Sequence, residues 1–192
     1  GDVIQGPWLM EQMKEQAAKV GTVIYNDLVT SVDFNSSTLT AKTDSGLIFE
    51  SKSIIITTGA QARWLKIKNE ERFKGYGISA CATCDGFFFK DQEIAVIGGG
   101  NSAVEEALFL TNFASKVTLI HRRDKLRAEK ILQERLFKHP KIKILWNKNV
   151  KEFQGSNDPI LLERIVLEDT INKNETTLNV TGAFIAIGHD PS

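Results

Sequence analysis

Both cysteines of the chain lie in the segment SACATCDG, as Cys81 and Cys84, and Asp85 directly follows the second one. A structural zinc site needs about four ligands, whereas the three histidines of the chain are scattered far from any matching spacing. A structural disulfide across so short a loop would restrict the unfolded chain very little. A redox-active dithiol suits the spacing better, since a neighbouring carboxylate can exchange a proton with a reactive thiolate. We therefore favour a redox pair over a metal site or a structural clip, and we predict no bound metal.

A glycine-rich turn comes next in the chain. It has the pattern G-x-G-x-x-A, preceded by the apolar run 94–97 and followed by a helical pattern that leads to a second apolar run, 117–120. In such a strand–turn–helix–strand unit the glycines let the backbone approach a pyrophosphate, and free N–H groups at the helix start receive its charge. The order of these elements therefore predicts a dinucleotide site. Its members are Gly98, Gly99, Gly100, Asn101, Ser102 and Ala103.

The residues after the second apolar run indicate which dinucleotide binds. NAD sites usually carry Asp or Glu there to hold the ribose hydroxyls. This chain instead has His121, Arg122 and Arg123, with Arg127 a helical turn further on. Because guanidinium groups pair with a phosphate through two parallel hydrogen bonds, we predict NADP(H). Asp124 is the one residue here that would suit an NAD ribose.

A dithiol beside a dinucleotide site raises a chemical requirement. NADPH delivers a hydride, and a flavin usually passes those two electrons to a disulfide. The two motifs together therefore predict that a flavin-binding module accompanies them.

Composition restricts the setting of this chemistry. The 192 residues include 24 basic and 24 acidic side chains, so no overall charge attracts nucleic acid or an anionic membrane. The longest apolar runs fall far short of the roughly 20 residues that a bilayer-spanning helix needs. No secretion signal opens the chain. We expect a soluble, cytoplasmic protein that binds neither nucleic acid nor membrane.

The elements that must position these residues follow from hydrophobic periodicity and turn signals. We expect helices at 7–20, 101–111 and 128–138, and a hairpin of 161–169 with 177–182. Strands are expected at 22–27, 29–34, 38–43, 47–50, 94–97, 117–120, 142–146 and 183–187. The run SIIITTGA, residues 53–60, is typical of a buried parallel strand that ends at a ligand loop. The three phenylalanines 87–89 are expected to serve packing rather than chemistry, with the alternative that one of them lines a cofactor site.

Four motifs in order, CATCDG, GGGNSAVEEA, HRRDKLRAEKIL and AIGHDP, resemble those of the low-molecular-weight, bacterial-type thioredoxin reductases, and the likeness covers essentially the whole chain. The resemblance implies an α/β fold in which a Rossmann-like, three-layer ββα NADPH domain is inserted into an FAD-binding domain, here incomplete. Residues 1–61 would be part of the FAD-binding domain, 62–188 the NADPH-binding domain, and 189–192 the start of the return. The family's N-terminal FAD fingerprint and C-terminal FAD segment are not in this sequence.

The same resemblance implies roles for individual residues. Cys81 and Cys84 would be the redox pair, with Cys84 facing the flavin and Asp85 protonating the departing thiolate. The glycine turn and the arginines would hold NADPH. Further residues implied near the nucleotide are Ile187, Gly188 and His189, and those implied near the flavin are Thr58, Gly59 and Ala60.

The implied enzyme is an NADPH-dependent thioredoxin-disulfide reductase, a homodimer that passes electrons through FAD to thioredoxin. Its two domains would rotate about hinges near 62–65 and 187–190. Two alternatives remain: the flavoprotein subunit of a peroxiredoxin-reducing system, and a non-catalytic NADP-binding or redox module. A ferredoxin-linked reductase is disfavoured, because the arginines would then have no phosphate to bind.

Overall fold

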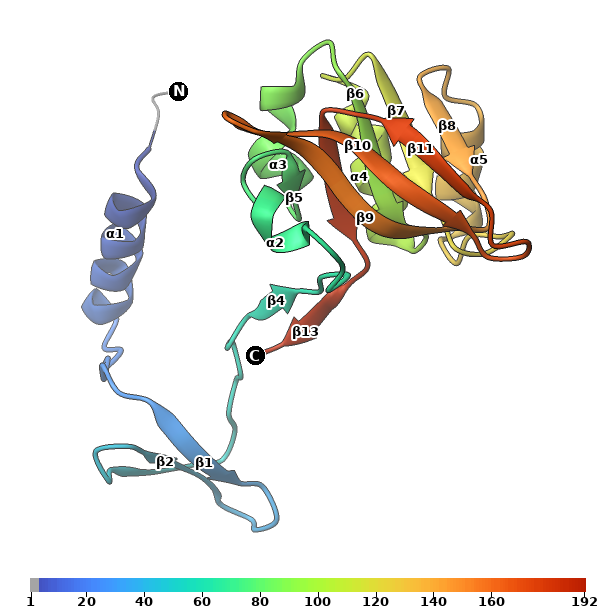
Figure 1. Cartoon of the computed structure of the whole chain (residues 1–192). Helices are drawn as coiled ribbons and strands as arrows, with labels where there is room; N and C mark the ends of the chain where they lie inside the picture. Colours follow the sequence, from blue (N-terminus) through green and yellow to red (C-terminus); the bar gives the residue numbers. More distant parts are fainter. Residues whose placement is uncertain (1–3) are drawn as a thin grey trace. The chain divides into compact units, whose positions relative to one another are not determined.

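Residues 4–192 are described by a computed structural model, and the chain forms two compact units. One ends at Thr57 and the other spans Thr58–Ser192 (Figure 1). The predicted domain limits at residues 61 and 188 stay predictions, since compactness alone assigns no cofactor to either unit. None of the described helices combines the length and the apolar character needed to cross a bilayer.

The first unit contains one helix and a small antiparallel sheet of order β1-β2-β3. Proline in the first turn fits helix α1, because its missing N–H has no partner there in any case. The helix and three of the predicted strands are confirmed. The bounds are α1 Gly6–Lys19, β1 Val29–Asp33, β2 Leu39–Thr43 and β3 Ile48–Ser51.

Two predicted strands are wrong. Residues 22–27 form no strand, and neither does the run 53–59. In the latter, Ile55 is 89% and Ile56 63% exposed. An apolar, β-branched run becomes a strand only where a neighbouring strand supplies its hydrogen bonds. Among residues 4–192 no strand pairs with this run.

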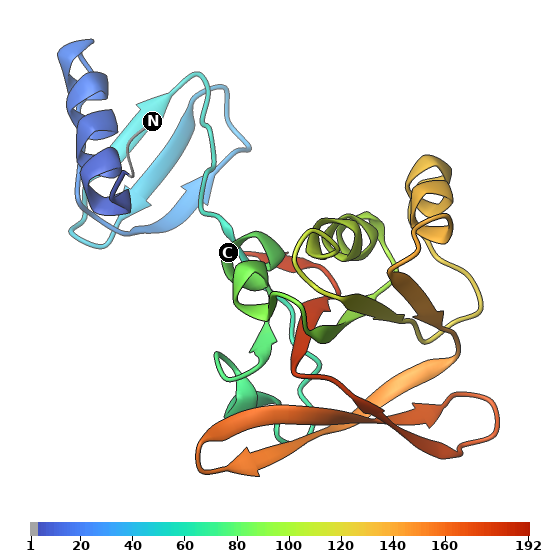
Figure 2. The same ribbon diagram turned by 90° about the horizontal axis from the view of Figure 1, so that it is seen from above.

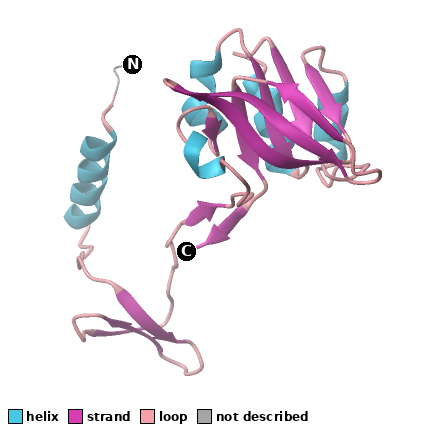
Figure 3. Ribbon diagram, in the orientation of Figure 1, coloured by secondary structure: helices cyan, strands magenta, loops and turns pink. Residues whose placement is uncertain are grey.

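The second unit is built on a parallel five-stranded sheet of order β5-β12-β6-β7-β8. All four neighbouring pairs are parallel, so each connection must cross over a face of the sheet. The strands, magenta in Figure 3, are β5 Ile78–Ser79, β6 Glu93–Gly98, β7 Lys116–Ile120, β8 Ile142–Leu145 and β12 Gly182–Ala186.

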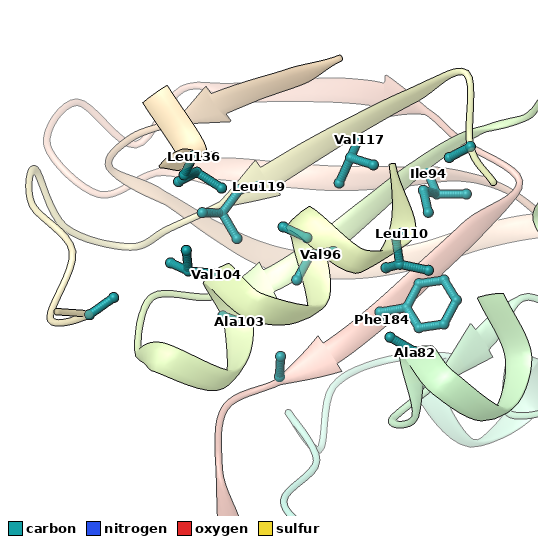
Figure 4. Close-up of a cluster of buried hydrophobic side chains, with 14 of the residues drawn as sticks. Ala82, Ile94, Val96, Ala103, Val104, Leu110, Val117, Leu119, Leu136 and Phe184 are labelled. Atoms are coloured by element: carbon teal, nitrogen blue, oxygen red, sulfur yellow. The ribbon is translucent and has the colours of Figure 1, made fainter. Parts of the chain in front are cut away.

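Helices cover one face of this sheet. Strand side chains alternate between the faces, and Ile94, Val96 and Leu119 point to the helical side, where they pack with Val104 (Figure 4). The helix expected at 101–111 is confirmed, and its buried residues include Ala103, Val104 and Ala107. The helices with residues in this core are α3 Ala82–Asp85, α4 Asn101–Leu110 and α5 Lys130–Phe137.

An antiparallel sheet of order β11-β10-β9 covers the other face. Its buried side chains, Phe153, Ile165 and Leu167, share a core with Ala95 and Ile97 of β6. Its strands are β9 Lys148–Asn157, β10 Ile160–Asp169 and β11 Glu175–Asn179. The hairpin of β10 and β11 was predicted and β9 was not. The unit thus has the three layers of the predicted Rossmann-like ββα fold, and Figure 2 shows them in profile.

A two-stranded ribbon, β4 Ala60–Ala62 with β13 His189–Pro191, brings together the beginning and the end of this unit. The N–H of Arg63 donates to the carbonyl of Gly188 over 3.0 Å, which extends the pairing. Arg63 also forms an ion pair with Asp190, with Nε donating to Oδ1 at 2.6 Å. The remaining short helices are α2 Glu70–Phe73 and the 3₁₀ helix η1 Gly86–Phe89.

Candidate functional site

Cys81 and Cys84 form a disulfide at the start of α3, with their Cα atoms 5.3 Å apart. Cys81 precedes the helix in an extended conformation, and its Sγ accepts a hydrogen bond from the N–H of Cys84 at 3.2 Å. Cys84 is exposed and Cys81 half-buried. The pair can therefore be reached from outside this unit.

Ser79, which sequence reasoning did not single out, links Asp85 to the disulfide segment. Its Oγ donates to Asp85 Oδ2 at 2.6 Å and accepts from the N–H of Cys81 at 3.0 Å. Ser79 is buried, and it ends the short strand that leads into the cysteines. The hydroxyl therefore holds the carboxylate of Asp85 against the segment that carries the disulfide.

The three phenylalanines after the disulfide do not all pack in the interior. Phe89 does, with its ring edge-to-face against buried Phe184 at 5.4 Å between centroids. The side chains of Phe87 and Phe88 are 67% and 72% exposed, and the ring of Phe87 lies edge-to-face with that of Phe113 at 6.3 Å between centroids. The one-turn η1 helix allows this, because it turns successive side chains to different sides.

The glycine turn opens a cavity of about 740 Å³ at the carboxyl ends of β6 and β7. We call it the glycine-turn cavity. Parallel α/β sheets bind ligands at this end of the strands. Its predicted lining residues are Gly98, Gly99, Gly100, Ser102, His121, Arg122, Arg127, Ile187 and Gly188.

Four other residues predicted at the nucleotide do not line this cavity: Asn101, Ala103, Arg123 and His189. The side chain of Asn101 accepts a hydrogen bond from the N–H of Glu129 at 2.8 Å. Ala103 is buried between α4 and the sheet, and Arg123 is exposed. Sequence reasoning missed other lining residues, among them Arg63, Lys148 and Lys151.

The backbone of the turn suits a phosphate group. No heavy atom lies within 4 Å of the position that a Cβ of Gly100 would take, so the backbone there is open. Helix α4 starts at the next residue without a side-chain cap, which leaves its first N–H groups available to an anion. Gly98 serves a different purpose, since a Cβ there would collide with the carbonyl oxygen of Ala186 and lie 2.6 Å from the Cβ of Ala103.

Charge also favours an anion in the glycine-turn cavity. Of the cations that line it, three are already paired with carboxylates: Arg63 with Asp190, Lys148 with Asp169, and Lys151 with Glu175. Arg122 and Arg127 make no ion pair with any residue of 4–192. These two guanidinium groups are therefore available to a ligand phosphate.

Two carboxyl groups have strongly shifted pKa values. The hydrogen bond from Lys148, 2.8 Å long, lowers the pKa of Asp169 to about 2 and keeps that carboxylate charged. On α4, burial raises the pKa of Glu106 to about 7, and its Oε2 has no hydrogen-bond partner within 4–192. Within the same range, no group of three or more His, Cys, Asp or Glu side chains is placed to hold a metal ion.

A second cavity, of about 520 Å³, lies at the disulfide, and we call it the disulfide cavity. It brings together residues from distant parts of the sequence: Ala60, Cys81, Cys84, Asp85 and His189. Apolar side chains complete its wall, among them Trp64 and Ile78. The other two residues of the predicted flavin-proximal turn do not line it. Thr58 Oγ1 donates to the carbonyl of Ser192 at 2.7 Å, and the carbonyl of Gly59 accepts from the N–H of Ser192 at 3.1 Å.

The two cavities lie on either side of the ribbon of β4 and β13 and its extension at Arg63 and Gly188, and neighbouring residues there line one cavity or the other. Arg63 lines the glycine-turn cavity, while its neighbours Ala62 and Trp64 line the disulfide cavity. Likewise, Gly188 lines the glycine-turn cavity and His189 lines the disulfide cavity. Because side chains of an extended segment alternate in direction, the ribbon and its extension form a partition between the two sites.

Comparison with known proteins gives one family. Residues 2–192 match the model described as pyridine nucleotide-disulphide oxidoreductase. Over 191 residues, 100% of this chain and 62% of the relative, it is 56% identical to a protein of Rickettsia felis named thioredoxin reductase. A Streptomyces coelicolor protein of the same name is 48% identical over 99% of this chain and 58% of its own length.

Solved structures give the same result. The thioredoxin reductase of Lactococcus lactis superimposes with a TM-score of 0.78 at 42% identity, over 98% of this chain and 61% of that one. That of Giardia duodenalis reaches a TM-score of 0.79 at 33% identity, over the same shares. The chain thus spans about three fifths of the length of the relatives that it matches.

Proposed function

The chain belongs to the pyridine nucleotide-disulphide oxidoreductases, and from this membership we propose that it forms the NADPH-binding and disulfide-bearing part of a thioredoxin reductase. The observation that carries the proposal is the pairing of two cavities on one partition. One presents a glycine turn and two unpaired arginines, and the other presents a disulfide. The relatives reported above are named thioredoxin reductases, which favours this function over the peroxiredoxin-linked and non-catalytic alternatives.

NADPH would occupy the glycine-turn cavity. Gly100 and the start of α4 would receive the pyrophosphate, and Arg122 and Arg127 the 2′-phosphate. The volume of about 740 Å³ is within the range of cofactor pockets. The chemistry that the nucleotide supplies when bound is a hydride, equivalent to two electrons.

FAD would meet this unit at the disulfide cavity. Ala60 and Trp64 offer apolar surface to a planar ring system, beside exposed Cys84. The predicted roles of Thr58 and Gly59 near the flavin remain proposals, and neither residue lines this cavity. His189, predicted at the nucleotide, lines this cavity instead. FAD supplies the route for two electrons from the nucleotide to the disulfide.

Asp85 would handle a proton of the reaction. A disulfide that accepts two electrons and two protons becomes two thiols. The hydrogen bond from Ser79 fixes the Asp85 carboxyl beside the segment that carries the sulfurs, where it can give a proton to a departing thiolate. One cysteine thiolate would then attack the disulfide of thioredoxin, and resolution of the mixed disulfide would restore the Cys81–Cys84 bond.

Exposed aromatic side chains support a protein substrate. Phe87 and Phe88 lie within four residues of Cys84 and offer apolar surface of the kind that protein interfaces bury. The homodimer, the cytoplasmic location and the rotation about hinges at 62–65 and 187–190 also belong to this proposal.

An anaerobic titration tests it. The full-length protein that contains this chain is titrated with NADPH, and separately with NADH, in the flavin absorption band. We expect about two NADPH per flavin, one for the flavin and one for the disulfide, and little reaction with NADH. The matched control is the double variant Cys81→Ser, Cys84→Ser, which should consume about one NADPH per flavin because it has no disulfide to reduce. Equal consumption by both proteins would show that the disulfide does not receive electrons from the flavin.

A further inference from the structure

The buried ring of His121 occupies an unusual place between two loops of the glycine-turn cavity. It is 5% exposed, its Nδ1 lies 2.8 Å from the carbonyl oxygen of Gly98, and its Nε2 lies 3.0 Å from that of Lys125. Each ring nitrogen thus faces a backbone carbonyl of a different segment. Gly98 ends strand β6, and Lys125 lies in the loop that carries the arginines.

The main chain of His121 is fixed as well. Its N–H donates to the carbonyl of Leu145 at 2.9 Å, and its own carbonyl accepts from the N–H of Lys148 at 3.1 Å. Trp146 stands edge-on to the ring at 6.1 Å between centroids. The main chain that carries the ring is therefore held by β8 and the start of β9, which lie outside the loop that the ring contacts.

Gly99 packs so closely against the His121 ring that a side chain at this position would not fit. A Cβ on Gly99 would collide with Nδ1 and Cε1 of His121 and lie 2.9 Å from Nε2. The carbonyl of Gly99 also accepts a hydrogen bond from the N–H of Arg127, 2.7 Å long. Glycine at this position thus lets the turn, the ring and the arginine loop come together.

Hydrogen bonds therefore fix the loop 121–127 at both ends, at His121 and at Arg127. Within this loop, Arg122 and Arg127 line the cavity. Arg123, which lies between them in the sequence, does not. We propose that His121 is a positioning residue that sets Arg122 and Arg127 for the 2′-phosphate of the nucleotide, and that Gly99 is a glycine because the His121 ring fills the space of its side chain. This inference deepens the proposed function and rests on NADPH binding in this cavity.

A double-mutant cycle on the full-length protein tests the proposal, with His121→Ala, Gly99→Ala and the double variant. NADP⁺ and NAD⁺ affinities are measured by titration calorimetry, and thermal unfolding is followed in parallel. We expect His121→Ala to weaken NADP⁺ binding about tenfold or more and NAD⁺ binding less than about threefold, since the arginines that it positions contact the 2′-phosphate, which NAD⁺ lacks. His139→Ala, a histidine outside both cavities, is the matched control and should change neither affinity.

The steric part of the proposal has its own outcome. Gly99→Ala should weaken NADP⁺ binding or lower the unfolding temperature in the presence of His121, and should do neither in the His121→Ala background, where the ring is gone. If Gly99→Ala alone does not fold, the comparison of the double variant with His121→Ala still decides the point, because the two should behave alike. Equal damage in both backgrounds contradicts the steric match.

Failure of this inference differs from failure of the proposed function. An unchanged NADP⁺ to NAD⁺ preference in His121→Ala, with tight NADP⁺ binding retained, overturns the positioning role and leaves the function intact. A wild-type protein that shows no preference for NADP⁺ overturns the assignment of the cavity itself.

Discussion

Replacing the three loop arginines one at a time separates residues that the sequence places in one motif. Arg122 and Arg127 line the glycine-turn cavity without an ion-pair partner within 4–192, whereas Arg123 does not line it. A hydrogen bond to a charged group contributes about 1.5–3 kcal/mol, and about 1.4 kcal/mol corresponds to a factor of ten in affinity. Arg122→Ala and Arg127→Ala should therefore each weaken NADP⁺ binding about 10- to 150-fold, and Arg123→Ala less than about threefold.

Titration calorimetry with NADP⁺ and NAD⁺ measures these effects. NAD⁺ lacks the 2′-phosphate, so its affinity should change less than about threefold in all three variants. Raising the salt concentration should weaken NADP⁺ binding more in the wild type than in Arg122→Ala, since a charge contact has been removed. The reasoning is refuted if Arg123→Ala loses as much NADP⁺ affinity as Arg122→Ala, because the lining of the cavity would then not mark the phosphate site.

Three further predictions concern stability and partner binding. Phe184→Ala removes a fully buried ring that packs on Phe89 and should lower the free energy of unfolding by about 3–5 kcal/mol in urea denaturation; a loss below about 1 kcal/mol would contradict the packing. Glu106→Gln should leave the unfolding temperature unchanged near pH 4.5 and raise it above pH 7. Burial raises the pKa of Glu106 in the folded state from 4.5 to about 7, so the stability that the protonated carboxyl contributes is lost as the pH rises through about 7. An equal gain at low pH would rule this out. Phe88→Ala should raise the KM for thioredoxin about tenfold and leave flavin reduction by NADPH unchanged, whereas an unchanged KM would place the docking surface elsewhere.

The parts of the fold that sequence reasoning predicts well are those whose signals are local. The strand at 94–97, the glycine turn, the apolar helix face and the strand at 117–120 all form as expected, because periodicity and turn chemistry agree along one continuous segment. The disulfide and the arginine loop follow from the same kind of short-range pattern. Arg123 shows the limit of prediction from short patterns. A motif names residue types, but the loop conformation decides which side chain lines the cavity.

The parts that it misses depend on distant partners. The run 53–59 has the composition of a buried strand, yet a strand needs a neighbour to complete its hydrogen bonds, and none pairs with it among residues 4–192. Lys148 and Arg63 reach the glycine-turn cavity only because β9 and the ribbon pack beside the parallel sheet. No feature of their own sequence neighbourhood marks them. Ser79 likewise becomes relevant only through its contact with Asp85.

The ribbon of β4 and β13 has a consequence for how this unit can be moved between proteins. Ala60 and Pro191 are register partners, so the chain enters and leaves the unit at one place. A segment whose ends already meet can be set into a loop of a host domain with little extra closure entropy, which is why domain insertions succeed at such sites. The glycine-turn cavity and the disulfide both lie between these two ends, so they would be transferred together if the unit were inserted into another protein.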